Sequence, residues 1–257
     1  MHNMEILITN DDGINAPGIN LLAQLMQSLG HVTMVAPDGP RSGQSSALTV
    51  NEPIRMKLLD QTPQMTRYVS TGTPADCVKL AMHQLYQNTR PDLLVTGINH
   101  GSNSALSVIY SGTMGAAMEG CANGVLSIGF SLDDHSMDAD FSHFASYILP
   151  ITQQILQLNV PYGTCFNINA PTGPIKGVRI TRQCKGYWGE EFEKRTDPHG
   201  RPYFWMTGRF LNQEPDAEDT DETFLQQGYI TVVPTKIDMT DYDFLKEIKT
   251  LNSDESR

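Results

Sequence analysis

Basic residues are scarce in this sequence. Its 18 lysines and arginines face 29 aspartates and glutamates, which gives a formal net charge of −11. The basic residues are scattered, so we expect no nucleic-acid duplex among the partners. An acidic chain still binds a small phosphate ester if it supplies positive charge locally, from a divalent cation or a helix N-terminus. The search therefore turns to sites of that kind.

Cysteines and long apolar runs are also few. The cysteines form no C-x-x-C pair, which argues against a zinc ribbon or a disulfide framework and favours reduced, structural thiols in a cytoplasmic protein. They are Cys77, Cys121, Cys165 and Cys184. No apolar run has the length of a membrane span, and no basic segment precedes an apolar one at the N-terminus. We expect neither a membrane partner nor secretion.

Several catalytic motifs are missing. The sequence contains no G-x-x-x-x-G-K-[ST] phosphate loop, no G-x-G-x-x-G dinucleotide fingerprint and no G-x-S-x-G nucleophile elbow. None of its seven histidines forms an H-x-x-x-H pair, which excludes a zincin. Asp11 and Asp12 are adjacent, unlike the D-x-D pair of the haloacid-dehalogenase phosphatases.

The first part of the chain alternates strand and helix patterns. We predict core strands at 5–9, 32–36, 92–96, 126–132 and 165–170, with extended segments at 48–59 and 68–71. We predict helices from Pro17 to a closing Gly30, from a Thr73 cap, from about Ser111, and over 141–158. This alternation is typical of a doubly wound, mostly parallel α/β sheet.

The pattern changes from about residue 177. We expect long antiparallel strands at 178–184 and 203–208, a further strand at 229–233, a helix over 241–251 and a solvated acidic loop over 214–222. The chain is interpreted as one domain, 1–257, with a core of about 4–176 and an antiparallel extension of about 177–257. Unpaired strand edges favour pairing with another copy, so we expect a homo-oligomer.

Three polar loops follow three of the predicted parallel strands. They comprise residues 10–13, 41–43 and 97–99. Ligands of open α/β sheets bind beyond the carboxyl ends of the strands, so the loops are expected to converge on one edge. Taken singly, Asp11-Asp12-Gly13 is equally well explained as a solvated turn, and Ser42 and Asn99 are each better explained as ordinary loop residues. Together they offer oxygen atoms suited to a hard divalent cation, from Asp11, Asp12, Ser42 and Asn99.

A second candidate is the segment Ser111-Gly112-Thr113, which opens a predicted helix. Its hydroxyls and backbone N–H groups suit an anion. The alternative is an ordinary N-cap, which the local sequence taken alone favours.

Five motifs occur in order along the chain. They are residues 6–14 (ILITNDDGI), 35–38 (VAPD) leading to 41–43 (RSG), 72–78 (GTPADCV), 97–101 (GINHG) and 110–113 (YSGT). With them the chain closely resembles the SurE family, stationary-phase survival proteins that act as 5′- and 3′-nucleotidases. The resemblance covers essentially the whole chain. The short 38–40 segment before Arg41 departs from many members and affects the expected substrate loop.

The resemblance implies a Rossmann-like core, one divalent metal per subunit (Mg²⁺ or Mn²⁺), and hydrolysis of nucleoside monophosphates to nucleoside and phosphate. It implies a homodimer or homotetramer built through the C-terminal extension. The implied metal ligands are Asp11, Asp12, Ser42 and Asn99, with one aspartate as base for direct attack by water. The implied phosphate contacts are Asn10, Gly43, Ser111, Gly112 and Thr113.

Two other functions bear weighing. Signalling receiver domains also carry an acidic pair after the first strand, but they need a phosphoacceptor aspartate after the third. The corresponding strand here ends in Val95-Thr96-Gly97, with no carboxylate. A nucleotide-binding protein without turnover is the second alternative, and phosphate release separates it from an enzyme.

Overall fold

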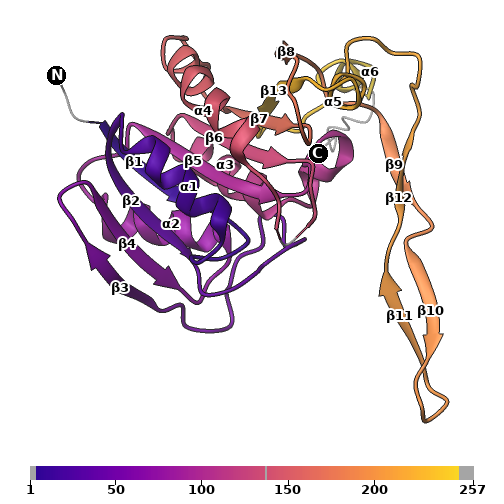
Figure 1. Cartoon of the computed structure of the whole chain (residues 1–257), viewed down its shortest axis with the longest axis horizontal. Helices are drawn as coiled ribbons and strands as arrows, with labels where there is room; N and C mark the ends of the chain where they lie inside the picture. The colour runs from indigo at the N-terminus through magenta and orange to yellow at the C-terminus, as the bar shows by residue number, and fades with distance from the viewer. Residues whose placement is uncertain (1–3, 137, 249–257) are drawn as a thin grey trace, which may run out of the picture.

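The computed structural model describes residues 4–136 and 138–248. A nine-stranded sheet forms its centre, in the order β3-β4-β2-β1-β5-β6-β7-β13-β8 (Figure 1). The strands are β1 (Met4–Thr9), β2 (Gly30–Pro37), β3 (Met56–Gln61), β4 (Met65–Ser70), β5 (Leu93–His100), β6 (Ser127–Leu132), β7 (Thr164–Ala170), β8 (Val178–Ile180) and β13 (Ile230–Lys236). The run from β4 to β7 is parallel throughout. This confirms the predicted mostly parallel α/β class.

Helices cover both faces of the sheet. They are α1 (Pro17–Met26), α2 (Pro74–Gln84), α3 (Gly112–Ala122) and α4 (Ser142–Ile155). Side chains of β1 alternate between two cores: Ile6 and Ile8 join α1 and α4, whereas Leu7 joins α2 and α3. The period of two along a strand explains this division. The sheet is therefore doubly wound.

Two predicted boundaries were wrong. Helix α1 ends at Met26, and Gly30 begins β2 instead of closing the helix. A Cβ at Gly30 would lie 2.0 Å from the Met4 carbonyl oxygen, so the glycine permits close approach of β1. Strand β5, expected to end at Thr96, continues through Asn99 to His100. The predicted cap of α2 is confirmed as a capping box between Thr73 and Asp76.

The C-terminal part differs from the prediction in its pairing. Of residues 178–184, only Val178–Ile180 form a strand, β8, which runs parallel to β13. Strand β13 in turn pairs antiparallel with β7. Strands β8 and β13 therefore belong to the main sheet, although both follow residue 177. The antiparallel strand predicted at 203–208 is confirmed as β11 (Pro202–Met206), and the other strands of the extension are β9 (Gly186–Gly189), β10 (Phe192–Thr196) and β12 (Arg209–Asn212). Pairs β9–β12 and β10–β11 form an arm that runs away from the sheet (Figure 1).

The prediction of a solvated loop over 214–222 was wrong for its last residues. Thr220 caps helix α5 (Asp221–Gln226), and the Asp221 side chain is fully buried. A short helix, α6 (Phe244–Glu247), lies within the predicted 241–251 helix, whose last residues fall outside the described range. In the described part of the chain, no helix combines the length and apolar character needed to cross a bilayer.

Candidate metal and phosphate site

The loop after β1 is shaped by its own side chains. Asn10 is fully buried, its Nδ2 donates to the Gly13 carbonyl (3.0 Å), and its Oδ1 accepts from the Gly13 N–H (3.2 Å). Gly13 has φ +98°, and a Cβ there would approach Gly39 to 3.1 Å. Both polar groups of the Asn10 side chain are thus engaged inside the loop. Asn10 holds the turn that presents the two aspartates.

Asp11 points at the N-terminus of α3. Its side chain is 4% exposed, and its Oδ1 accepts a 2.6 Å hydrogen bond from the Thr113 hydroxyl. A Cβ at Gly112 would lie 2.8 Å from Asp11 Cβ, so glycine permits this contact. Burial raises the pKa of Asp11 to about 6, against the Thr113 bond and with a smaller contribution from the Asp12 charge. Burial thus disfavours the charged form of Asp11, and a nearby positive charge would stabilise the carboxylate.

Asp12 is held from the other side by the end of β5. Its Oδ2 lies 3.2 Å from His100 Nδ1 and accepts from the His100 N–H at 3.3 Å. The His100 ring packs edge-on against Phe141, with centroids 5.1 Å apart. Asn99 precedes this contact, and its Nδ2 donates to the Gly101 carbonyl at 2.8 Å. That bond orients the amide, whose Oδ1 is the atom with the chemistry to bind a cation.

The third loop is attached to the other two through its backbone. The Arg41 N–H donates to the Asp11 carbonyl at 2.7 Å, and the Arg41 guanidinium binds Asp38 at 2.7 Å. Ser42 and Gly43 follow and are exposed. Farther on, Ser45 bonds the carbonyls of residues 109 and 110, just before Ser111. Hydrogen bonds thus connect all four predicted site segments.

The two hydroxyl residues of the Ser111-Gly112-Thr113 segment have different partners. Ser111 is the N-cap of α3, and its Oγ accepts from the Met114 N–H at 3.0 Å. The cap alternative is therefore confirmed for Ser111. The Thr113 hydroxyl is directed to Asp11, so it orients a predicted metal ligand. Phosphate binding by this helix N-terminus stays a prediction, based on the free N–H groups of a first helical turn.

The donor set fits a hard cation. Within residues 4–136 and 138–248, no three histidine, cysteine, aspartate or glutamate side chains gather as a metal site. Two carboxylates, a hydroxyl and an amide oxygen are available near one sheet edge, from Asp11, Asp12, Ser42 and Asn99. Oxygen ligands of this kind suit Mg²⁺ or Mn²⁺ better than a metal that prefers thiolates. The adjacent carboxylates also gain most from a cation, because they repel one another.

Sequence reasoning missed a buried polar network behind the site. The Asn103 N–H donates to Asn169 Oδ1 (2.7 Å), and Asn103 Nδ2 donates to Ser131 Oγ (2.8 Å). Asn167 Nδ2 donates to the Asn103 carbonyl at 2.8 Å. These bonds fix the start of the loop that leads to Ser111. Two asparagines at alternate positions of a predicted core strand, 167 and 169, were the available signal.

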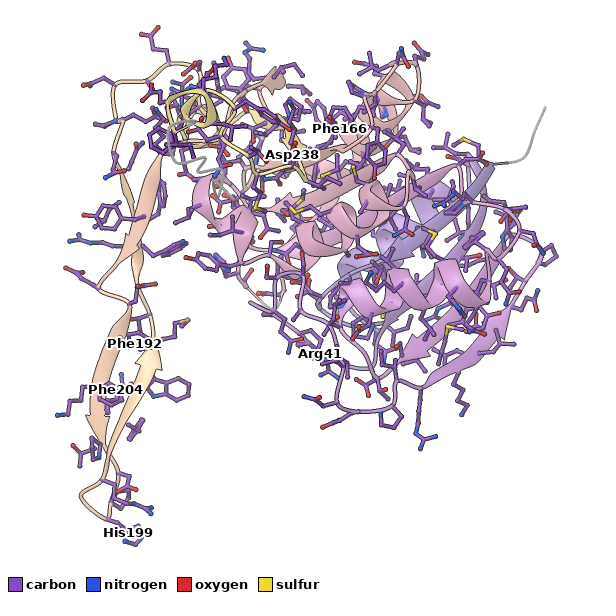
Figure 2. The ribbon with its side chains drawn as sticks, turned by 180° about the vertical axis from the view of Figure 1, so that it is seen from behind. Arg41, Phe166, Phe192, His199, Phe204 and Asp238 are labelled. Atoms are coloured by element: carbon purple, nitrogen blue, oxygen red, sulfur yellow. The ribbon has the colours of Figure 1, made fainter. Side chains whose placement is uncertain are left out.

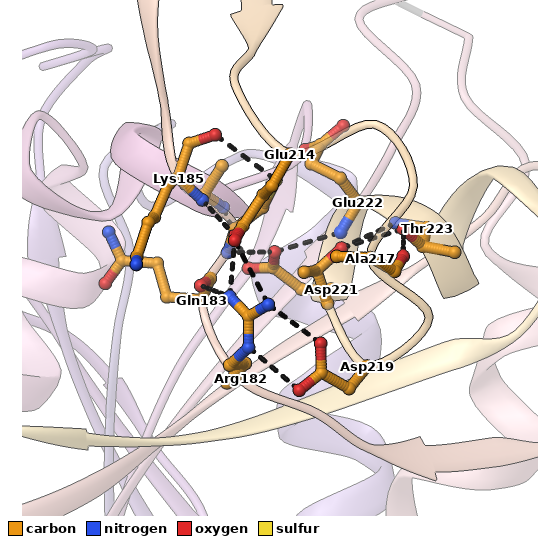
Figure 3. Close-up of polar contacts among 12 residues, drawn as sticks. Arg182, Gln183, Lys185, Glu214, Ala217, Asp219, Asp221, Glu222 and Thr223 are labelled. Carbon is orange, nitrogen blue, oxygen red and sulfur yellow. Dashed lines mark hydrogen bonds and ion pairs between the residues drawn. The ribbon is translucent and has the colours of Figure 1, made fainter.

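A second missed group centres on Asp221 at the base of the arm, which Figure 3 shows among neighbouring polar residues. The buried Asp221 carboxylate accepts N–H bonds from Ala105 and Cys184, both at 2.8 Å, and from Glu222. The Ser104 hydroxyl bonds Glu222. Burial raises the pKa of Asp221 against these bonds. Asp221 therefore ties the base of the arm to the first residue of η1 (Ala105–Ile109).

Comparison with known proteins agrees with the fold. The family model described as survival protein SurE matches residues 6–190. The chain is 48% identical over 248 residues to "5′-nucleotidase SurE" of Phocaeicola vulgatus, covering 96% of each protein. It is 46% identical over 246 residues to the protein of that name from Cytophaga hutchinsonii, covering 95% of each. The crystal structure of a SurE protein from Aquifex aeolicus superposes with a TM-score of 0.83 at 36% identity, covering 97% of this chain and 100% of that one.

Proposed function

The chain belongs to the SurE family, and on that basis we propose that it is a metal-dependent 5′-nucleotidase. It hydrolyses nucleoside monophosphates to nucleoside and phosphate, and we extend the proposal to 3′-monophosphates. The observation that carries it is the Asp11-Asp12 pair, held between the N-terminus of α3 and the end of β5. Relatives that are named 5′-nucleotidase support the reaction class.

One divalent cation per subunit, Mg²⁺ or Mn²⁺, is proposed to bind Asp11, Asp12, Ser42 and Asn99. When bound, such an ion neutralises phosphoryl charge and lowers the pKa of a coordinated water. Thr113 and His100 hold the two carboxylates in fixed orientations. Asp12, whose side chain is 17% exposed, is the less buried of the pair. We assign it as the base that takes the proton of the attacking water.

The substrate phosphate is proposed to lie against the first turn of α3, beside Gly43, Gly112 and Thr113. Positive partial charge at the helix N-terminus stabilises the phosphate and the charge that develops in the transition state. This position places the phosphorus beside the carboxylate pair. The chain's own contribution to catalysis is thus positioning and charge compensation, with little covalent chemistry.

Assembly and location complete the proposal. The arm carries apolar side chains that are largely exposed in the single chain, including Phe192 (62%), Phe204 (58%) and Met206 (74%); Figure 2 shows Phe192 and Phe204 on its outer part. Exposed apolar surface of this kind marks an interface. We propose a homodimer or homotetramer through the arm, a single domain over 1–257, and a cytoplasmic protein.

The test of the function is phosphate release by Asp12→Asn. Loss of this charge should weaken metal binding and nearly abolish hydrolysis of a panel of nucleoside monophosphates, assayed with Mg²⁺ and with Mn²⁺. Asp60→Asn is a matched control, because Asp60 lies on β3 and pairs with Arg67 away from the site. Wild-type protein that binds nucleotide without releasing phosphate would leave only the binding function. Wild-type turnover by Asp12→Asn would refute the assigned site.

A further inference from the structure

Two of the four cysteines lie together in one small core. Cys121 is in the last turn of α3, and Cys165 is near the start of β7. Both belong to one apolar cluster with Val108, Met114 and Ala117. All four cysteines are free thiols in the structure, as the sequence predicted. The position of this pair, at the far end of α3 from the proposed substrate site, gives it no role in phosphate hydrolysis.

The two thiols have different surroundings. The Cys165 thiol is fully buried and donates to the Thr235 carbonyl at 3.6 Å. Cys121 lines a cavity of about 370 Å³ between the end of α3 and residues 158–164. Cavities of this size admit small organic molecules. The Cys121 side chain, 3% exposed, thus borders a space that a reagent can enter, whereas Cys165 is fully buried.

The pKa values of the two thiols also differ: that of Cys121 is lowered and that of Cys165 is raised. The hydrogen bond from Cys165 lowers the pKa of Cys121 to about 7, against burial. The same interaction and burial raise the pKa of Cys165 well above its ordinary value. By contrast, burial raises the pKa of Cys77 to about 12 and that of Cys184 to about 11. Thiolate character is what makes a cysteine react with disulfides.

We propose that Cys121 and Cys165 form a redox-active pair that reacts with small disulfides, with Cys121 as nucleophile and Cys165 as resolving thiol. The Cys121 thiolate attacks one sulfur of the reagent, an S–S bond breaks, and one thiolate leaves. Cys165 then attacks the Cys121 sulfur, the mixed disulfide breaks, and the second thiolate takes up the Cys165 proton. Two protein thiols are oxidised to one internal disulfide while the reagent disulfide is reduced to two thiols.

The test uses an aromatic disulfide whose released thiolate is coloured, added to the native full-length protein. We expect two thiolates per chain, no retained reagent, and a Cys121–Cys165 disulfide in the peptide map. Cys121→Ala should abolish the reaction. Cys184→Ala is the matched control and should behave as wild type, because Cys184 lies at the base of the arm with a raised pKa. Melting curves establish that each variant is folded.

The decisive variant is Cys165→Ala. It should release one thiolate and retain the reagent on Cys121. Loss of the hydrogen bond from Cys165 should raise the pKa of Cys121 toward its ordinary value, so the adduct should form more slowly than wild type releases its first thiolate. A stable adduct on wild-type Cys121, a disulfide that involves another cysteine, or no release from native protein would overturn the proposal.

Discussion

The hydrogen bond from Thr113 to Asp11 offers a sharp test of how the site is built. Thr113 is fully buried, and its hydroxyl lies 2.6 Å from Asp11 Oδ1. Thr113→Val keeps the branched shape but removes the donor. A hydrogen bond to a charged group contributes about 1.5–3 kcal/mol. At about 1.4 kcal/mol for each factor of ten, divalent-metal affinity should fall about 10- to 150-fold.

The assay compares wild type, Thr113→Val and Thr113→Ser after chelator treatment. Calorimetric titration with Mn²⁺ gives the metal affinity, and phosphate release at saturating metal gives kcat. Thr113→Ser restores the donor and should recover most of the affinity. Because the bond satisfies a buried carboxylate, the melting temperature of the valine variant should also fall, and Thr113→Ser should recover it. An unchanged Mn²⁺ affinity in Thr113→Val, with normal kcat, would show that this bond is only structural and would refute the reasoning.

Two further outcomes are expected. Because the arm exposes large apolar side chains, light scattering at micromolar concentration should give a multiple of the 28.5 kDa chain mass, and a monomer would remove the arm as an interface. The second outcome concerns Asp221, whose pKa is raised in the folded state by burial. A raised pKa means that the folded state binds this proton more tightly, so the stabilisation grows as pH falls from 7 toward the ordinary aspartate value near 4. The free energy of unfolding of wild type, measured in urea relative to Asp221→Asn, should therefore increase from pH 7 to pH 5, and a decrease would contradict the assigned environment.

The α/β core was predictable because local and long-range signals agree. The apolar run of β1, the Thr73 cap of α2 and the Ser111 start of α3 are each readable within a few residues. The C-terminal part lacked such agreement. Strands β8 and β13 belong to the main sheet because β13 pairs with β7, a partner more than 60 positions away. Pairing between distant segments is set by tertiary packing, which composition and period do not report.

At the site, residue types were predictable and side-chain partners were not. The apolar run of the first strand predicted that Asp11 and Asp12 follow β1, and the structure places them there. The loop rule placed Asn99 after a strand that in fact continues to His100. Nothing local indicated that Asp221, in an acidic run, is buried. Its burial depends on N–H donors from Ala105 and Cys184, at separations of 116 and 37 residues, and such donors satisfy a carboxylate only after folding.

The shortage of positive charge in the sequence has a structural answer at the edge of the sheet. Arg41 is the cation nearest in sequence to the predicted ligands, but its guanidinium is bound by Asp38. Within the chain, the negative charge of Asp11 is therefore compensated by the N-terminus of α3, which carries only about half a unit of positive charge. Asp12 adds a second carboxylate beside Asp11, and its Oδ2 lies within hydrogen-bond distance of His100 Nδ1. The remaining negative charge is what a divalent cation would balance, and a phosphate ester could then bind the same helix end without repulsion from the pair.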